Sequence, residues 1–204
     1  ALAQGNPYED GAWAPPGAYT VELKVDGKTY RQPLTVIADP RVHLRADAYA
    51  RQFSFARQVE DLQARLSAAQ SQAGALHGQL QSARKDADGE LAAAIAALDG
   101  KVVAIGGIAD APNHYNAWAI PPGNTDNFRY LDGALGSLAG AADGADAAPS
   151  PDALAGCKAL TAKLDEVLSR WKTLQATDLP ALNARLKAAG KKAVGGGDKQ
   201  RKNP

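Results

Sequence analysis

The sequence predicts a mainly α-helical protein: an up-down four-helix bundle preceded by a short β-hairpin. Two observations predict the helices. Apolar residues recur every three or four positions in four separate stretches, the spacing that keeps one helix face apolar. Alanine makes up roughly a fifth of the chain, which favours helices that pack closely. The hairpin is predicted by alternating apolar and polar residues near the N-terminus, the pattern of a half-buried strand.

The predicted hairpin follows an irregular Gly- and Pro-rich segment, residues 1–17. Its first strand carries alternating apolar residues at Tyr19, Val21, Leu23 and Val25. Asp26-Gly27 is a hairpin turn signal, and residues 29–37 are the returning strand, which we expect Pro33 to interrupt. Two strands alone are marginal in water. The hairpin therefore either packs on the bundle or, as we favour, belongs to a larger β-sandwich whose other strands are missing.

The longest predicted helix, residues 47–83, organises the bundle. Asp47 is its expected N-cap, because a carboxylate can accept hydrogen bonds from the first free amides of a helix. A helix of this length needs partners along its apolar stripe. The stripe comprises Tyr49, Phe53, Ala56, Val59, Leu62, Leu66, Ala69, Ala73, Leu76, Leu80 and Ala83.

Three shorter helices complete the predicted bundle. The second ends at Gly106-Gly107, and a crossover without clear periodicity, residues 108–125, leads to a third that starts near Thr125 or Asp126. Ser150-Pro151-Asp152 opens the fourth with a cap and an early proline. Residues 178–180 either restart or kink this helix, which continues to Gly190. Their apolar stripes are Leu91, Ile95, Leu98, Val102 and Ile105; Phe128, Leu131, Leu135 and Leu138; and Leu154, Cys157, Leu160, Leu164, Val167, Trp171 and Leu174.

Charge and composition limit the possible functions. The net charge is +1, but five basic residues against one aspartate gather in residues 191–204, which we expect to be a disordered basic tail. The remaining body is slightly acidic, which argues against a nucleic-acid-binding surface. No apolar run approaches the length needed to cross a bilayer. The chain lacks methionine, so we expect a processed or excised piece of a longer polypeptide.

No catalytic, cofactor-binding or metal-binding residue is predicted. The three histidines are far apart and lack metal-ligand spacing. Cys157, the only cysteine, lies on an apolar stripe and is expected to behave as a small hydrophobe. The acid pairs at 60–61 and 165–166 lie on polar helix faces, where nothing pushes their pKa values apart as acid–base catalysis requires.

The candidate residues for recognition are aromatic or imidazole side chains in irregular segments. They are His114, Tyr115 and Trp118 in the crossover, together with Trp13 near the N-terminus. Loops carry function more often than their scaffolds do, and Tyr and Trp are enriched where partners dock. The alternative is that Trp118 plugs one end of the bundle.

Four segments near the N-terminus carry a resemblance to a known family: residues 16–23, 26–28, 32–36 and 39–42. The N-terminal segments resemble the end of an Ig/fibronectin-like domain of bacterial Asp-box (BNR-repeat), sortilin-like β-propeller proteins, often described as glycosyl-hydrolase-like. Residues 143–151, Trp171 and residues 182–190 resemble the helical C-terminus of the same family. The chain contains no Asp-box repeat and no first half of the Ig-like domain, so no functional residue carries over.

The resemblance implies an Ig-like β-sandwich completed by the hairpin, and a periplasmic or secreted bacterial protein. We expect residues 1–42 to be the C-terminal part of the β-domain, residues 43–190 the helical bundle and residues 191–204 the tail. The expected function is a non-catalytic structural or interaction module whose partner is the propeller and Ig-like remainder. The alternatives are an accessory part of a glycan-directed hydrolase, or a free-standing periplasmic binding protein with a pocket lined by Trp118 or Trp171.

Overall fold

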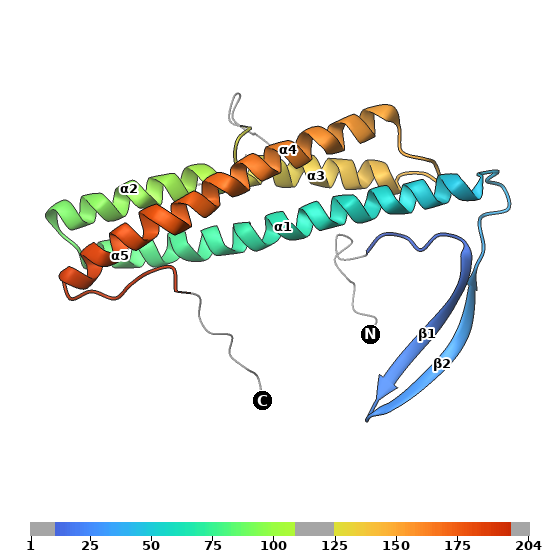
Figure 1. Ribbon diagram of the computed structural model, residues 1–204, viewed down its shortest axis with the longest axis horizontal. Coiled ribbons are helices and arrows are strands. Elements are labelled where there is room, and N and C mark those ends of the chain that lie inside the picture. Colours follow the sequence, from blue (N-terminus) through green and yellow to red (C-terminus); the bar gives the residue numbers. More distant parts are fainter. Residues whose placement is uncertain (1–10, 109–124, 197–204) are drawn as a thin grey trace. The chain divides into compact units, whose positions relative to one another are not determined.

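The computed structural model describes residues 11–108 and 125–196. It is mainly helical with a two-stranded antiparallel hairpin (Figure 1). This confirms the prediction of a mainly α-helical protein with a short β-hairpin. The chain divides into two compact units: residues 1–62 with 135–158, and residues 63–134 with 159–204. The predicted division into residues 1–42, 43–190 and 191–204 remains a prediction.

The hairpin consists of β1 (Gly17–Val25) and β2 (Lys28–Val36), paired from Gly17 opposite Val36 to Val25 opposite Lys28. The predicted turn residues join them, with φ of 48° at Asp26 and 74° at Gly27. Two consecutive positive φ angles characterise a type I′ turn, whose twist matches that of the flanking strands. The turn prediction is confirmed.

The prediction that Pro33 interrupts the second strand is wrong, because β2 continues through it with Pro33 opposite Thr20. In a two-residue hairpin the pair next to the turn is hydrogen-bonded, and hydrogen-bonded and non-hydrogen-bonded pairs then alternate. Thr20 and Pro33 therefore form a non-hydrogen-bonded pair, in which both backbone nitrogens point away from the partner strand. The missing N–H of proline removes no bond from the hairpin.

The long helix α1 (Ala46–Lys85) starts one residue before Asp47. Asp47 thus lies in the first turn instead of capping it, and its carboxylate pairs with Arg45 and Arg51. The apolar stripe is buried from Ala56 to Leu80 as predicted. Its first turns differ, since Phe55 is buried at 3% exposure while Phe53 lines a pocket.

Two capping residues meet between α2 (Gly89–Gly106) and α3 (Phe128–Asp143). Gly107 ends α2 with φ 65°, as the glycine pair predicted. Asn127 caps α3, its side-chain oxygen accepting from the Tyr130 amide at 2.9 Å. A Cβ at position 107 would lie 2.5 Å from the Asn127 oxygen and 2.7 Å from Arg129 Cβ, so only glycine fits.

The last helix passes Pro180 without a break. It comprises α4 (Pro151–Thr173), the π-helical segment η2 (Leu174–Asp178) and α5 (Leu179–Ala188), one continuous ribbon from orange to red in Figure 1. The Leu179 amide bonds to the Leu174 carbonyl, five residues back. A π turn shifts the bonding partners where proline cannot donate to its usual carbonyl. The Ser150 cap predicted for α4 is confirmed, with the Ala153 amide 3.1 Å from its hydroxyl.

The second unit has a continuous apolar core. Trp171 is 2% exposed; its ring meets Phe128 edge to face at 6.1 Å, and its Nε1 donates to Gln72 on α1 at 3.2 Å. Residues 191–196, the start of the predicted basic tail, lie against this core: the Val194 backbone makes two hydrogen bonds with the Asn183 amide group, and Val194 is 6% exposed.

Candidate functional site

The first unit presents an exposed apolar surface on the hairpin, here called the hairpin face. It consists of Tyr19, Val21, Leu23, Val25, Tyr30 and Leu34, which the strand register places on one side of the sheet together with Lys28, Gln32 and Val36. Leu23 is 58% exposed, Tyr30 55% and Val21 52%. Buried strands carry such residues against a second layer, so a sheet face of this composition is a candidate interaction surface.

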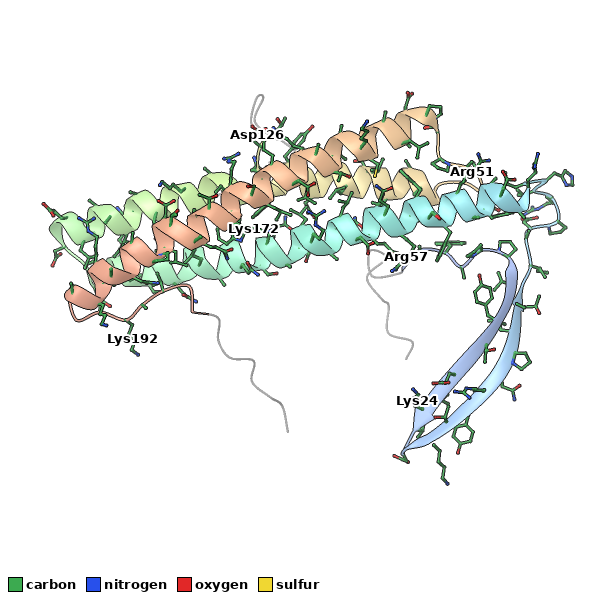
Figure 2. The ribbon with its side chains drawn as sticks, viewed as in Figure 1. Lys24, Arg51, Arg57, Asp126, Lys172 and Lys192 are labelled. Atoms are coloured by element: carbon green, nitrogen blue, oxygen red, sulfur yellow. The ribbon has the colours of Figure 1, made fainter. Side chains whose placement is uncertain are left out.

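The opposite side of the hairpin is polar. Glu22 pairs with Arg31 across the strands at 2.7 Å and with Lys24 at 3.0 Å. These two cations lower the pKa of the Glu22 carboxyl below its ordinary value, Lys24 contributing more. Figure 2 shows Lys24 among the side chains that stand out from the strands. The hairpin is thus amphipathic, the pattern of a sheet with one solvated and one covered face.

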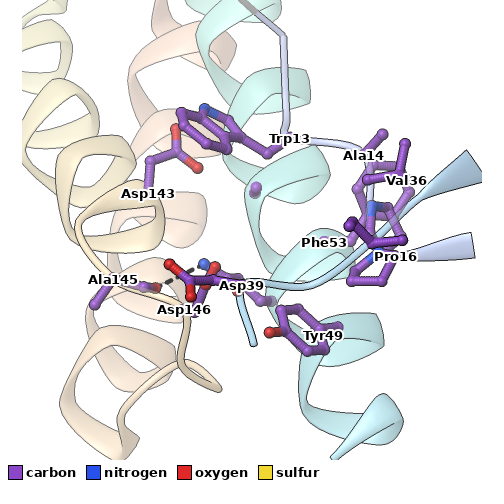
Figure 3. A pocket seen from close by; sticks show the side chains of 14 residues that line it. Trp13, Ala14, Pro16, Val36, Asp39, Tyr49, Phe53, Asp143, Ala145 and Asp146 are labelled. Atoms are coloured by element: carbon purple, nitrogen blue, oxygen red, sulfur yellow. Dashed lines mark hydrogen bonds between the residues drawn. The ribbon is translucent and has the colours of Figure 1, made fainter. Parts of the chain in front are cut away.

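The same unit contains a pocket of about 480 Å³, within the range of small-ligand sites. It is bordered by the segment around Trp13, the end of β2, the first turns of α1 and the loop after α3 (Figure 3). Gln52 holds this loop to α1, since its side-chain amide donates to the carbonyls of Ala142 and Ala145, both at 2.9 Å. The Ala12 amide donates to Glu60 on α1, which positions the neighbouring Trp13.

Aromatic rings and carboxylates line this pocket together. Trp13 and Asp143 lie at one end in Figure 3, while Tyr49 lies with Asp39 and Asp146 at the other. The Tyr49 hydroxyl oxygen is buried and has no hydrogen-bond partner among the described residues. Burial, followed by the charges of Asp146 and Asp39, raises the Tyr49 pKa, so the phenol stays neutral.

The carboxylates of the pocket differ in their neighbours. Arg41 forms a two-pronged ion pair with Asp39 and lowers the pKa of that carboxyl. The Asp143 pKa is raised, first by burial and then by the charge of Glu60. In the described part of the chain no ion pair joins Asp143 or Asp146 to a basic side chain. Aromatic faces beside unneutralised carboxylates are the groups that bind organic cations.

The four residues predicted for recognition have different outcomes. Trp13 lies at the rim of the pocket and is 77% exposed. His114, Tyr115 and Trp118 lie outside the described residues. Trp171, the other tryptophan expected at a pocket, borders a cavity of about 420 Å³ in the second unit, but the indole is buried and already donates to Gln72.

The sequence did not predict a polar cluster that surrounds one buried carboxylate in the second unit. Asp99 on α2 is 6% exposed; its carboxylate lies 2.7 Å from His77 Nδ1 and accepts from Gln81 Nε2 at 2.5 Å, both on α1. Because the carboxylate is satisfied by two partners, it joins the two helices. The sequence contained one signal for this cluster, because Asp99 directly follows Leu98, a residue of the apolar stripe of α2.

Cys157 is buried, as its place on the stripe predicted. Within residues 11–108 and 125–196, no three His, Cys, Asp or Glu side chains are grouped so that they could hold a metal ion, and no helix has both the length and the apolarity to span a membrane.

Comparisons with protein-family models, with curated proteins and with solved structures found no match to this chain.

Proposed function

We propose that this protein is a non-catalytic interaction module whose hairpin completes an Ig-like β-sandwich with strands of a partner. The four helical stretches act as an up-down bundle that carries the hairpin. The partner is the Ig-like and propeller remainder of an exported protein, as the sequence resemblance implies. The observation that carries the proposal is the exposed hairpin face on a sheet of only two strands.

The exposed area is large enough to contribute appreciably to association. Full burial of a large apolar side chain is worth about 1.5–3 kcal/mol. Five side chains of the hairpin face are roughly half exposed: Val21, Leu23, Val25, Tyr30 and Leu34. Covering them would therefore supply on the order of 5 kcal/mol. Association costs a comparable amount, so this face suits a partner that also pairs its backbone or is held nearby by covalent linkage.

The test is co-purification of tagged variants from the native source, with intact-mass analysis of the complex. The wild-type chain should co-elute at fixed stoichiometry with a polypeptide that contains a β-sandwich. Leu23→Thr with Leu34→Thr should lose this polypeptide, because both changes remove apolar surface while retaining strand propensity. The matched control, Thr20→Ser with Thr35→Ser on the polar face, should retain it. Equal retention by both variants would exclude the hairpin face as the interface.

The pocket favours a second candidate function, a binding protein for organic cations. Its support is the combination of three aromatic rings with a Tyr49 oxygen and two carboxylates that, within residues 11–108 and 125–196, have no hydrogen-bond partner and no basic partner respectively. An ammonium group would stack on the rings and donate to these oxygens.

Tetramethylammonium and butylammonium are suitable probes, measured by calorimetry and by Trp13 fluorescence. Asp143→Asn should weaken both equally if charge provides the attraction, and Tyr49→Phe should weaken only butylammonium, which has N–H donors. The control is Asp152→Asn on α4, outside the pocket lining. Absence of any saturable shift at millimolar probe would refute this candidate.

A further inference from the structure

The two edges of the hairpin are not equivalent. The strand register assigns the outward-pointing backbone groups of β1 to Ala18, Thr20, Glu22 and Lys24. On β2 the outward-pointing positions are Thr29, Arg31, Pro33 and Thr35. Among the described residues, neither edge is paired with a further strand. An unpaired edge of this kind is a template for strand addition.

Pro33 closes one of these edges. It occupies the middle of the outward row of β2 and supplies no N–H. A strand added there would have an unsatisfied acceptor at its centre, and natural sheets use proline in this way to block edge pairing. The outward row of β1 contains no proline, so it offers its full set of donors and acceptors.

We propose that the free edge of β1 is the attachment site for an extended strand of the partner's β-sheet, and that β2 is the terminal strand of the completed sheet. This inference rests on the proposed function and specifies its geometry. The residues of the added strand that lie opposite Tyr19, Val21 and Leu23 are apolar, so that the hairpin face continues onto this strand. Its other side is polar, next to Glu22 and Lys24.

A partner sheet fits this edge better than a second copy of the chain does. Two β1 strands can pair antiparallel over their whole length with Val21 opposite Val21. That arrangement places both hairpin faces on the same side of the sheet and so enlarges the exposed apolar surface. It also places the two Glu22 carboxylates diagonally across the new strand pair, where like charges repel. A β-sandwich partner supplies both the neighbouring strand and a facing layer.

Thr20 and Pro33, which lie opposite each other in the hairpin, provide the test. The probe is the synthetic peptide GAYTVKLKV, which keeps the alternation of β1 but carries lysine where β1 carries Glu22, so that the like-charge contact of a β1–β1 pair is absent. It is added to the full ¹⁵N-labelled chain. Amide exchange should slow at Thr20 and Glu22 and not at Thr29 or Arg31. Thr20→Pro should weaken peptide binding about tenfold or more, because the peptide then has an unsatisfied acceptor. Pro33→Thr, directly opposite, should leave the β1 site intact and create a second site on β2.

The amides of Val21 and Leu23, which face β2, monitor the fold of each variant. If the Thr20→Pro variant no longer shows the NMR contacts of these amides with β2, the hairpin has unfolded. Glu22→Pro then replaces it as the variant whose β1 edge is blocked by proline. Protection of the β2 amides, or of neither set, would overturn the proposal, as would unchanged binding by a folded Thr20→Pro variant. A chain that sediments as a dimer with Thr20 and Glu22 protected would overturn the choice of partner in favour of a second copy. These outcomes concern the edge, whereas the Leu23 and Leu34 variants test the face.

Discussion

Two leucines in the first unit, Leu23 and Leu62, distinguish a covered face from an open one. Leu62 on α1 is 4% exposed, whereas Leu23 on β1 is 58% exposed. Truncating a buried leucine to alanine costs about 2–5 kcal/mol, because contacts are lost and a cavity remains. Away from such sites a surface substitution usually changes stability by about 0.5 kcal/mol or less. We therefore expect Leu62→Ala to destabilise the free chain several-fold more than Leu23→Ala.

The assay is thermal unfolding of the purified chain followed by far-UV circular dichroism. At about 2–4 °C per kcal/mol for a chain of this size, Leu62→Ala should lower Tm by roughly 4–20 °C. Leu23→Ala should lower it by about 2 °C at most. A comparable loss for both variants would show that the hairpin face is already packed in the free chain. The argument for a missing partner layer would then fail.

Three further predictions concern stability. Gly107→Ala should lower the free energy of unfolding in urea by about 2 kcal/mol or more, because a Cβ would meet Asn127 in a left-handed backbone. Gly100→Ala, with open space around it, should raise this free energy by about 0.5–1 kcal/mol. Equal effects would refute the cap geometry. Asp99→Ala should cost about 1–3 kcal/mol by removing the hydrogen bonds of a buried carboxylate with His77 and Gln81, and an unchanged midpoint would contradict that network. Asp143→Asn should raise Tm at pH 7, because a raised carboxyl pKa means that the folded state holds the proton more tightly and loses stability as pH rises. The gain in Tm should vanish below the ordinary aspartate pKa. A gain in Tm that does not depend on pH would contradict this cause.

The helices could be predicted from the sequence because their signals are local. The three-and-four spacing located the stripes of α1 to α4, and glycine or serine marked the ends at Gly107 and Ser150. The error at Pro33 and the open question at Pro180 concern positions where a local rule has two structural solutions. Pro33 is excluded only from inward-pointing strand positions, and Pro180 is accommodated by a π turn.

The pocket could not be predicted in the same way. Trp13, Asp39, Tyr49 and Asp143 are separated by tens of residues, and no spacing rule brings them together. Each also has an ordinary local interpretation, such as an Asp-Pro turn or a helix end. Only the tertiary structure shows that, among the residues it describes, the Tyr49 oxygen has no hydrogen-bond partner and Asp143 forms no ion pair with a basic side chain.

The central claim, that the hairpin is an incomplete β-unit, is tested most directly by amide hydrogen exchange. The measurement compares the free chain with the complex isolated gently from its source. In the free chain, the cross-strand amides of Val21, Leu23 and Tyr30 should exchange within about tenfold of open-chain rates, while amides around Leu66 should be protected by global stability. In the complex the hairpin amides should become protected as well. Full protection of the hairpin in a monomeric free chain would contradict the account.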